Sequence, residues 1–269
     1  MTLAQQFADL HQPGAPLLLA NAWDAASAAA IEHAGAKAIA TTSAGVAWSL
    51  GEPDDDRLGA DSTAQVVRRI VKSVSVPVSV DVEAGYGPTT DDVRKTVGAI
   101  VGAGAVGINI EDRRAGPVLF EPTEQAERLT AAREGAGADE CWINVRTDVF
   151  LSGQYGSIAS GVEEVLRRAP FYKEAGANSL FVPGLVELDA LADVVAGPLP
   201  VAVMVWPGAP TVAELAAVGV VRISLGAAIV QAAYGLASRA ATELFTAGTY
   251  DLCAGGVDYG SFNASLTRT

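Results

Sequence analysis

Cysteine and histidine are scarce in this sequence, which contains two of each. The cysteines are Cys141 and Cys253, the histidines are His11 and His33, and no C-x-x-C pair or Cys/His cluster joins them. A zinc site is therefore disfavoured. The cysteines could form one disulfide, but reduced thiols, as in a cytoplasmic protein, are favoured.

Long apolar runs are missing as well. No uncharged apolar run reaches the roughly 18–20 residues that a membrane-spanning helix needs. The first residues, Met1–Gln6, lack a basic segment followed by an apolar one, so a signal peptide is not predicted. We therefore expect a cytoplasmic protein with no membrane partner.

Positive charge is in deficit. Lys and Arg number 18 against 31 Asp and Glu, which gives a formal net charge of −13. A surface this acidic repels nucleic acid, so we exclude nucleic acid as a partner. A small anionic substrate would need a local cation, which could be a metal ion or a well-placed arginine.

Aromatic residues make up only 6% of the chain, yet 50% of it is hydrophobic and the mean hydropathy is +0.28. The apolar residues recur in short runs that are nearly continuous rather than alternating, which is typical of parallel strands buried on both faces. We predict eight strands: Leu17–Ala20, Ala38–Thr41, Val78–Val82, Gly107–Glu111, Trp142–Arg146, Ser179–Val182, Ala202–Val205 and Val221–Ser224.

Helical spacing separates these runs. The predicted helices are Asp24–Ala34, Thr63–Ser73, Asp91–Gly102, Glu121–Glu134, Val162–Ala175, Thr211–Ala217 and Ala227–Ala247. Eight strands alternating with helices predict an α/β fold of the (β/α)₈ TIM-barrel type, with one domain over residues 1–269. The alternative, an open doubly wound sheet, is disfavoured because no G-x-G-x-x-G follows the first strand.

Acidic residues collect where two neighbouring strands end. Asp81 and Glu83 end the third predicted strand and Glu111 ends the fourth, so all three meet at the carboxyl-terminal rim, where barrels carry their chemistry. Carboxylates this close repel one another unless a cation lies among them. Oxygen ligands without histidine suit Mg²⁺ or Mn²⁺. Arg146, which ends the next strand, could bind a substrate anion with its planar fork.

Other residues near the rim allow more than one interpretation. The small turn Ser43-Ala44-Gly45 could offer backbone N–H groups to the same anion. An acid at a strand end can instead cap the following helix, so Asp81 or Glu111 alone would decide nothing. Trp23 and Trp206 are candidates for pocket walls or core, Tyr86 could face either way, and the histidines are predicted to be structural.

Six segments carry a resemblance to the isocitrate lyase/phosphoenolpyruvate mutase superfamily. They run in order between about residue 15 and residue 230: Asn21-Ala22-Trp23-Asp24, Thr42-Ser43-Ala44-Gly45-Val46-Ala47, Gly51-Glu52-Pro53-Asp54, Asp81-Val82-Glu83-Ala84-Gly85-Tyr86-Gly87, Gly107-Ile108-Asn109-Ile110-Glu111-Asp112 and Asn144-Val145-Arg146-Thr147-Asp148. The D-x-[DE]-x-G-[YF]-G and I-E-D segments together are specific, although each alone would be weak.

The resemblance implies a set of roles. Asp81 would bind Mg²⁺ directly or through water, and Asp54, Glu83 and Glu111 would complete its shell. Arg146 and the Ser43–Gly45 backbone would hold the anionic groups of the substrate. Together with the aromatic candidates above, we expect Asp81, Tyr86 and Arg146 to be catalytic, and we expect the substrate contacts to be Trp23, Ser43, Ala44, Gly45, Asp81, Arg146 and Trp206. The family is commonly tetrameric, built from dimers that exchange a C-terminal helix, and residues 227–269 would be that oligomerisation segment and tail.

One segment departs from the family pattern. Lyases of this superfamily carry a K-[KR]-C-G-H loop after the fourth strand, but residues 112–120 here contain no cysteine, lysine or histidine. The chain thus looks like a divergent, phosphonomutase-like branch. The favoured hypothesis is a Mg²⁺-dependent lyase or hydrolase that cleaves or forms a C–C bond of a small 2-oxo or 2-hydroxy carboxylate through an enolate. The alternatives are a P–C bond phosphonomutase or phosphonopyruvate-type enzyme and a non-catalytic metabolite-binding barrel.

Overall fold

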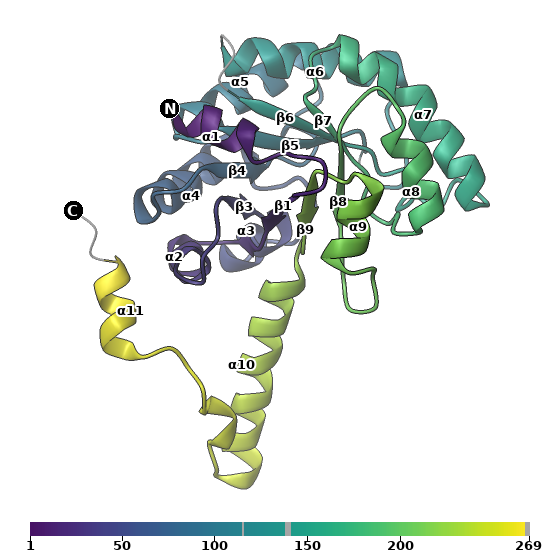
Figure 1. The fold of residues 1–269 in the computed structure, drawn as a ribbon. Coiled ribbons are helices and arrows are strands. Elements are labelled where there is room, and N and C mark those ends of the chain that lie inside the picture. Colours follow the sequence, from purple (N-terminus) through teal and green to yellow (C-terminus); the bar gives the residue numbers. More distant parts are fainter. Residues whose placement is uncertain (115, 138–140, 267–269) are drawn as a thin grey trace.

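Parallel strands form a ring at the centre of the computed structural model, which describes residues 1–114, 116–137 and 141–266 (Figure 1). Within these residues the strand order is β1-β9-β8-β7-β6-β5-β4-β3-β2. The strands are β1 Leu17–Leu19, β2 Asn21–Ala22, β3 Ile39–Thr41, β4 Val78–Asp81, β5 Gly107–Glu111, β6 Trp142–Arg146, β7 Ser179–Phe181, β8 Val201–Met204 and β9 Arg222–Ser224. This arrangement confirms the predicted (β/α)₈ barrel.

All eight predicted strands are present, but the first is interrupted. Ala20 separates β1, which pairs with β9, from β2, which pairs with β3. The Asn21 side chain lies across this seam: its amide donates to the Thr41 carbonyl at 2.9 Å, and its oxygen accepts from the Leu225 N–H at 3.2 Å. A side chain thus links the two sides of the interrupted strand.

Helices surround the ring (Figure 1). Their bounds are α1 Leu3–Asp9, α2 Ala25–His33, α3 Ser43–Ser49, α4 Gly59–Ser73, α5 Thr90–Gly102, α6 Pro122–Ala136, α7 Ile158–Glu174, α8 Leu188–Val195, α9 Val212–Val218, α10 Ala228–Ala247 and α11 Tyr259–Leu266. The sequence analysis missed α1, α3, α8 and α11. Each spans eight residues or fewer, which gives the 3.6-residue period too few repeats to stand out.

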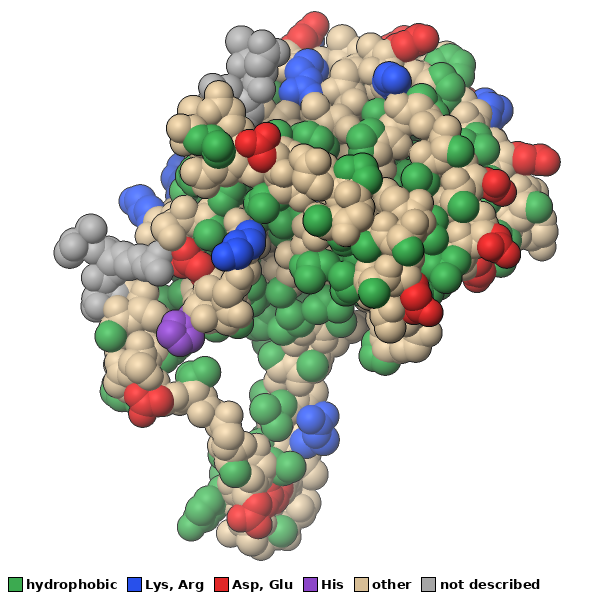
Figure 2. All heavy atoms as spheres, viewed as in Figure 1, with side chains coloured by type: hydrophobic (Ala, Val, Ile, Leu, Met, Phe, Trp, Pro, Cys, Tyr) green, Lys and Arg blue, Asp and Glu red, His purple; other side chains and the backbone are tan. Residues whose placement is uncertain are grey.

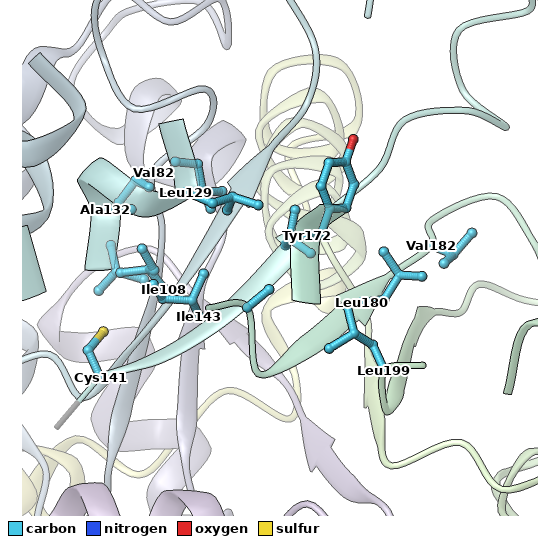
Figure 3. Packing of buried hydrophobic residues seen from close by; sticks show 14 of the residues in the cluster. Val82, Ile108, Leu129, Ala132, Cys141, Ile143, Tyr172, Leu180, Val182 and Leu199 are labelled. Atoms are coloured by element: carbon cyan, nitrogen blue, oxygen red, sulfur yellow. The ribbon is translucent and has the colours of Figure 1, made fainter. Parts of the chain in front are cut away.

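Apolar side chains fill the layer between the strands and the outer helices. Figure 3 shows Ile108, Ile143 and Leu180 of the strands beside Leu129 of α6 and Tyr172 of α7. All five are almost completely buried. This layer is the core that the continuous apolar runs predicted.

The inside of the barrel is polar at mid-height. Asn144 donates to Asn109 Oδ1 at 2.9 Å and accepts from the Ser179 hydroxyl at 2.5 Å. Arg222 Nη2 donates to the same Asn109 oxygen at 3.0 Å. Burial lowers the pKa of Arg222 to about 9. These linked side chains form a rigid floor beneath the carboxyl ends of the strands.

Helix α1 closes the opposite end of the barrel. His11 stacks on Trp142 with ring centroids 4.1 Å apart, and its Nδ1 lies 2.8 Å from the Phe7 carbonyl oxygen. Burial, aided by the charge of Arg222, lowers the pKa of His11 to about 3, so the ring is neutral. This placement agrees with the predicted structural role of His11.

Helix α10 runs away from the barrel, and the chain then returns so that α11 packs against α2 (Figure 1). Hydrophobic side chains gather on the barrel where α10 leaves it (Figure 2). Across the described ranges, no helix combines the length and apolar character needed to cross a membrane. Both cysteines are free thiols, Cys141 buried and Cys253 exposed.

Candidate active site

A cavity of about 300 Å³ opens at the carboxyl ends of the strands. Its lining residues are Asn21, Thr42, Ser43, Ala44, Asp54, Asp81, Asn109, Arg146, Phe181, Met204, Val205, Trp206, Ser224, Leu225, Gly226, Ala227, Ala228 and Gln231. The cavity therefore lies on the rim where the sequence placed the chemistry.

Asp81 lies at the end of β4 with its carboxylate in the cavity. Its backbone N–H donates to Thr41 Oγ1 at 2.9 Å, which fixes the strand end. Its carboxylate accepts long hydrogen bonds from the N–H groups of Ser43, at 3.4 Å, and Glu83, at 3.3 Å. No lysine or arginine of the described chain forms an ion pair with Asp81. Its charge is therefore available to a cation.

Glu83 lies behind Asp81 and does not line the cavity. Its Oε2 accepts the Asp56 N–H at 2.7 Å, which holds the loop that carries Asp54 at the rim. Burial, followed by repulsion from Asp81, raises the pKa of Glu83 to about 8. Burial and Asp81 also raise the pKa of Asp54. The negative charge of Asp81 is thus felt by both neighbouring carboxyl groups.

Arg146 is the hub of an ion-pair network. Its Nε and Nη2 donate to the two carboxylate oxygens of Asp148 at 2.6 and 2.9 Å, and its Nη1 lies 3.0 Å from Glu111 Oε2. Arg113 joins from the surface, 3.4 Å from Glu111 and 3.3 Å from Asp148. Burial raises the pKa of Glu111 to about 7, against the attraction of Arg146. Burial by itself would lower the pKa of Arg146. The negative charges of Glu111 and Asp148 have the larger combined effect and raise this pKa.

The segment Ser43–Gly45 is helical rather than a free turn. It forms the start of α3, where Ser43 and Ala44 line the cavity. Gly45 does not line it. A Cβ at Gly45 would lie 2.7 Å from Trp23 Cβ and 2.8 Å from Thr42 Cγ2, so glycine is needed there for close packing. The predicted anion contact through the backbone N–H groups of this segment stays a prediction, and Ser43 and Ala44 are the residues of the segment that face the cavity.

Two aromatic candidates lie outside the cavity. Trp23 packs between Gly45 and Tyr234 of α10, with the two ring centroids 6.5 Å apart. The Tyr86 hydroxyl is buried beside Thr63 of α4. A left-handed backbone at Glu83 and Tyr86, with φ of 49° and 50°, turns the chain away from the rim after β4. Trp206, by contrast, lines the cavity and is 41% exposed.

The sequence analysis passed over several cavity residues. Asn109 precedes Glu111 by two residues on β5, and side chains two residues apart on a strand point to the same face. The sequence alone could therefore have predicted that Asn109 faces the cavity. Asn21 begins β2, directly after the first predicted strand, and Ser224 ends β9. Gln231 could not have been found, because it comes from α10, a helix that the sequence assigned to subunit contacts.

The acidic rim suits Mg²⁺ held by few protein ligands. Within the described residues, no group of three or more His, Cys, Asp or Glu side chains is arranged to hold a metal ion. Mg²⁺ commonly keeps several waters and binds through one or two carboxylates. Asp81, which lacks a cationic partner, fits a direct ligand, and Asp54, Glu83 and Glu111 fit ligands through water. The metal site at this rim remains a prediction, with Asp81 as its expected direct ligand.

The raised pKa values predict an unusual pH dependence of the metal-free protein. Folded Glu83 and Glu111 titrate at about 8 and 7, above their ordinary 4.5, so the folded state binds more protons than the unfolded state in this range. The free energy of unfolding should fall as pH rises from 6.5 to 8, by at most about 1.4 kcal/mol per pH unit and group. Urea denaturation in EDTA measures this fall, and millimolar Mg²⁺ should reverse it at pH 8. A free energy of unfolding that rises with pH over the same range would contradict the raised pKa values of Glu83 and Glu111.

The loop that distinguishes the lyases is a short hairpin here. Among its described residues, the Arg114 N–H donates to the Val118 carbonyl and the Phe120 N–H to the Asp112 carbonyl, each at 2.8 Å. Ala115 lies outside the described residues. Arg114 also lies over the Phe120 ring, 4.4 Å from its centroid. The hairpin thus presents arginines at the rim where other members carry cysteine, lysine and histidine.

A (β/α)₈ barrel with carboxylates and one arginine gathered in a cavity at its carboxyl-terminal rim has the architecture of an enzyme. The chain belongs to the phosphoenolpyruvate phosphomutase family, whose model matches residues 7–245. This confirms the resemblance to the isocitrate lyase/phosphoenolpyruvate mutase superfamily.

Three similar proteins illustrate the range of the family. An uncharacterised Mycobacterium tuberculosis protein is 35% identical over 236 residues, which cover 87% of each chain. The Escherichia coli 2-methylisocitrate lyase is 31% identical over 66% of this chain and 64% of its own. A crystal structure from Burkholderia cenocepacia, provisionally assigned as a phosphonomutase, is 40% identical over 88% of this chain and 98% of its own, with a TM-score of 0.82.

Proposed function

We propose that this chain is a Mg²⁺-dependent lyase or hydrolase that cleaves or forms a C–C bond beside the 2-oxo or 2-hydroxy group of a small carboxylate. One observation carries the proposal: Asp81 and Arg146 line the same cavity. The first offers oxygen ligands to a cation and the second offers N–H donors to an anion. Mn²⁺ would suit the same oxygens.

The residues of the cavity can bind and orient such a substrate. Three of the five guanidinium N–H groups of Arg146 are committed to Glu111 and Asp148, so two are left to bind a carboxylate. Ser43 and Ala44 at the start of α3 line the same space, where the Ser43 N–H makes a long hydrogen bond to Asp81. Bound Mg²⁺ would supply Lewis-acid stabilisation of the enolate charge that C–C cleavage generates, typically worth several kcal/mol.

Titration calorimetry with oxalate, a planar mimic of enolpyruvate, tests this function. Oxalate should bind in the presence of Mg²⁺ and not in EDTA, because the dianion needs the charge that Asp81 recruits. Absence of binding in both conditions would overturn the proposal. Binding that is equally tight with and without Mg²⁺ would also contradict it, since Arg146 alone would then account for the affinity.

A P–C bond mutase is the second candidate. The 40% identity to the Burkholderia cenocepacia protein provisionally assigned as a phosphonomutase favours it. Phosphorus NMR of phosphonopyruvate incubated with enzyme and Mg²⁺ separates the two candidates. A new phosphate-ester or inorganic phosphate signal would support P–C chemistry, and an unchanged spectrum after long incubation would exclude it.

We also propose that α10 is exchanged between subunits of a homotetramer built as a dimer of dimers. The barrel leaves a groove of about 560 Å³ beside β9, lined by apolar residues that include Leu18, Ile31 and Val212. Helix α10 extends away from the barrel and exposes Leu244 and Phe245, the latter 82% exposed. A second copy of the chain would cover both apolar surfaces.

The proposed exchange of α10 predicts that a charged residue at position 245 will weaken the association of subunits. Phe245→Glu should reduce the molecular mass in light scattering from that of a tetramer to that of a smaller species, because a carboxylate would be buried in the interface. Thr246→Glu, one residue along the same exposed helix, is the matched control and should leave the mass unchanged. A monomeric wild-type protein would refute the exchange.

A further inference from the structure

The two sides of the cavity differ in charge. Asp81, on the third strand of the ring when β1 and β2 are counted as one, lies across the barrel from the seventh strand, β8. The end of β8 and the neighbouring elements present Phe181, Met204, Val205, Trp206, Leu225 and Ala227. These residues are called the apolar wall below. The half of the cavity opposite the acidic rim is therefore poorly suited to charge.

Cations are missing from that half. Of the described residues that line the cavity, Arg146 alone is cationic, whereas Asp54 and Asp81 are acidic. Arg222 lies in the floor, only 2% exposed, where it is bonded to Asn109. Arg113 does not line the cavity and is paired with acidic residues of the rim. Among the described residues, no second guanidinium or ammonium group therefore lines the cavity where a distal anion would lie.

The neutral polar groups on this side do not replace a cation. Ser224 and Gln231 can each donate a hydrogen bond, but neither carries charge. Moving a carboxylate or phosphonate out of water against the apolar wall would cost several kcal/mol without a paired cation. An alkyl or aryl group in the same place would gain from the burial of its surface.

We infer, on the basis of the function proposed above, that the substrate is a monocarboxylate. Its single carboxylate and 2-oxo or 2-hydroxy group lie at the Asp81–Arg146 side. The rest of the molecule is uncharged, carries the one hydroxyl or carbonyl group that C–C cleavage requires so that the departing fragment leaves as a neutral carbonyl compound, and is otherwise apolar and packs on the apolar wall. The cavity is thereby adapted to a 2-oxo or 2-hydroxy monocarboxylic acid with a hydrophobic substituent, rather than to a dicarboxylate or a phosphonate.

Two pairs of ligands of equal shape test the inference by displacement of oxalate in the presence of Mg²⁺. Phosphonopyruvate is paired with 4,4-dimethyl-2-oxopentanoate, and 2-oxoglutarate with 5-methyl-2-oxohexanoate. In each pair, the apolar member should displace oxalate at a concentration at least about tenfold lower, as expected from a difference of about 1.4 kcal/mol or more. Tighter binding of the charged member in both pairs, with oxalate still binding, would overturn this inference and leave the proposed function intact.

A positive charge introduced at Gln231, on the same side of the cavity as the apolar wall, gives the converse test. Gln231→Arg should reduce the preference for the apolar member at least about tenfold, because it supplies the missing counter-charge. Ser238→Arg, on the same helix but outside the cavity lining, adds the same charge and should leave the preference unchanged. If both variants change the preference for the apolar ligand to the same extent, this preference does not arise in the cavity and the inference fails. If oxalate itself does not bind with Mg²⁺, the proposed function fails and this inference with it.

Discussion

Replacing Asp81 with asparagine should abolish Mg²⁺-dependent binding of oxalate and reduce turnover of any substrate about a thousandfold or more. A thousandfold corresponds to about 4 kcal/mol of lost transition-state stabilisation, the size expected when a Lewis-acid metal is lost. Asparagine keeps the shape of the side chain and an oxygen to accept the long hydrogen bonds from Ser43 and Glu83. Only the charge is removed.

The same substitution should leave the fold intact and even stabilise it. Asp81 raises the pKa values of both Asp54 and Glu83 by repulsion, so its neutralisation relieves an unfavourable interaction in the metal-free protein. We therefore expect an unchanged or higher Tm in EDTA together with lost binding. Asp193→Asn, an exposed acid on α8, is the control and should change neither. A lower Tm with binding retained would identify Asp81 as a structural residue.

The ring of strands and the charged residues of the rim could be predicted from the sequence. Runs of Val, Ile and Leu marked each strand, and the barrel geometry then placed residues that end neighbouring strands side by side. Asp81, Glu111 and Arg146 followed from these two steps alone. In the network around Arg146, Asp148 pairs with this arginine, whereas Asp112 pairs with Arg168 of α7.

Other features depend on contacts that no local pattern records. Asn21 bonds to the backbone of Leu225 across 204 positions of the chain, and Arg222 reaches Asn109 across 113. The orientation of Tyr86, which the sequence left open, has a different cause: the left-handed backbone at Glu83 and Tyr86 ends the strand alternation that would have carried its side chain to the rim. Long-range side-chain bonds and positive φ angles at residues other than glycine therefore limit the prediction.

Replacing Arg146 with methionine should destabilise the protein by about 3–5 kcal/mol, because it leaves the buried carboxylates of Glu111 and Asp148 without their main partner. Urea denaturation at pH 7 measures this loss, which should shrink at lower pH as Glu111 becomes protonated. Oxalate affinity should fall about a hundredfold, within the range for loss of one member of a buried charge pair.

The double variant Arg146→Met with Glu111→Gln separates the two roles of the arginine. Neutralising Glu111 removes one unpaired buried charge, so part of the lost stability should return, whereas oxalate affinity should stay low because the guanidinium is still absent. Arg146→Lys keeps a charge but cannot fork onto Asp148, and it should bind oxalate more weakly than the wild type. Recovery of oxalate binding in the double variant would show that Arg146 only supports the fold, and the anion site would then have to be assigned to other residues of the rim.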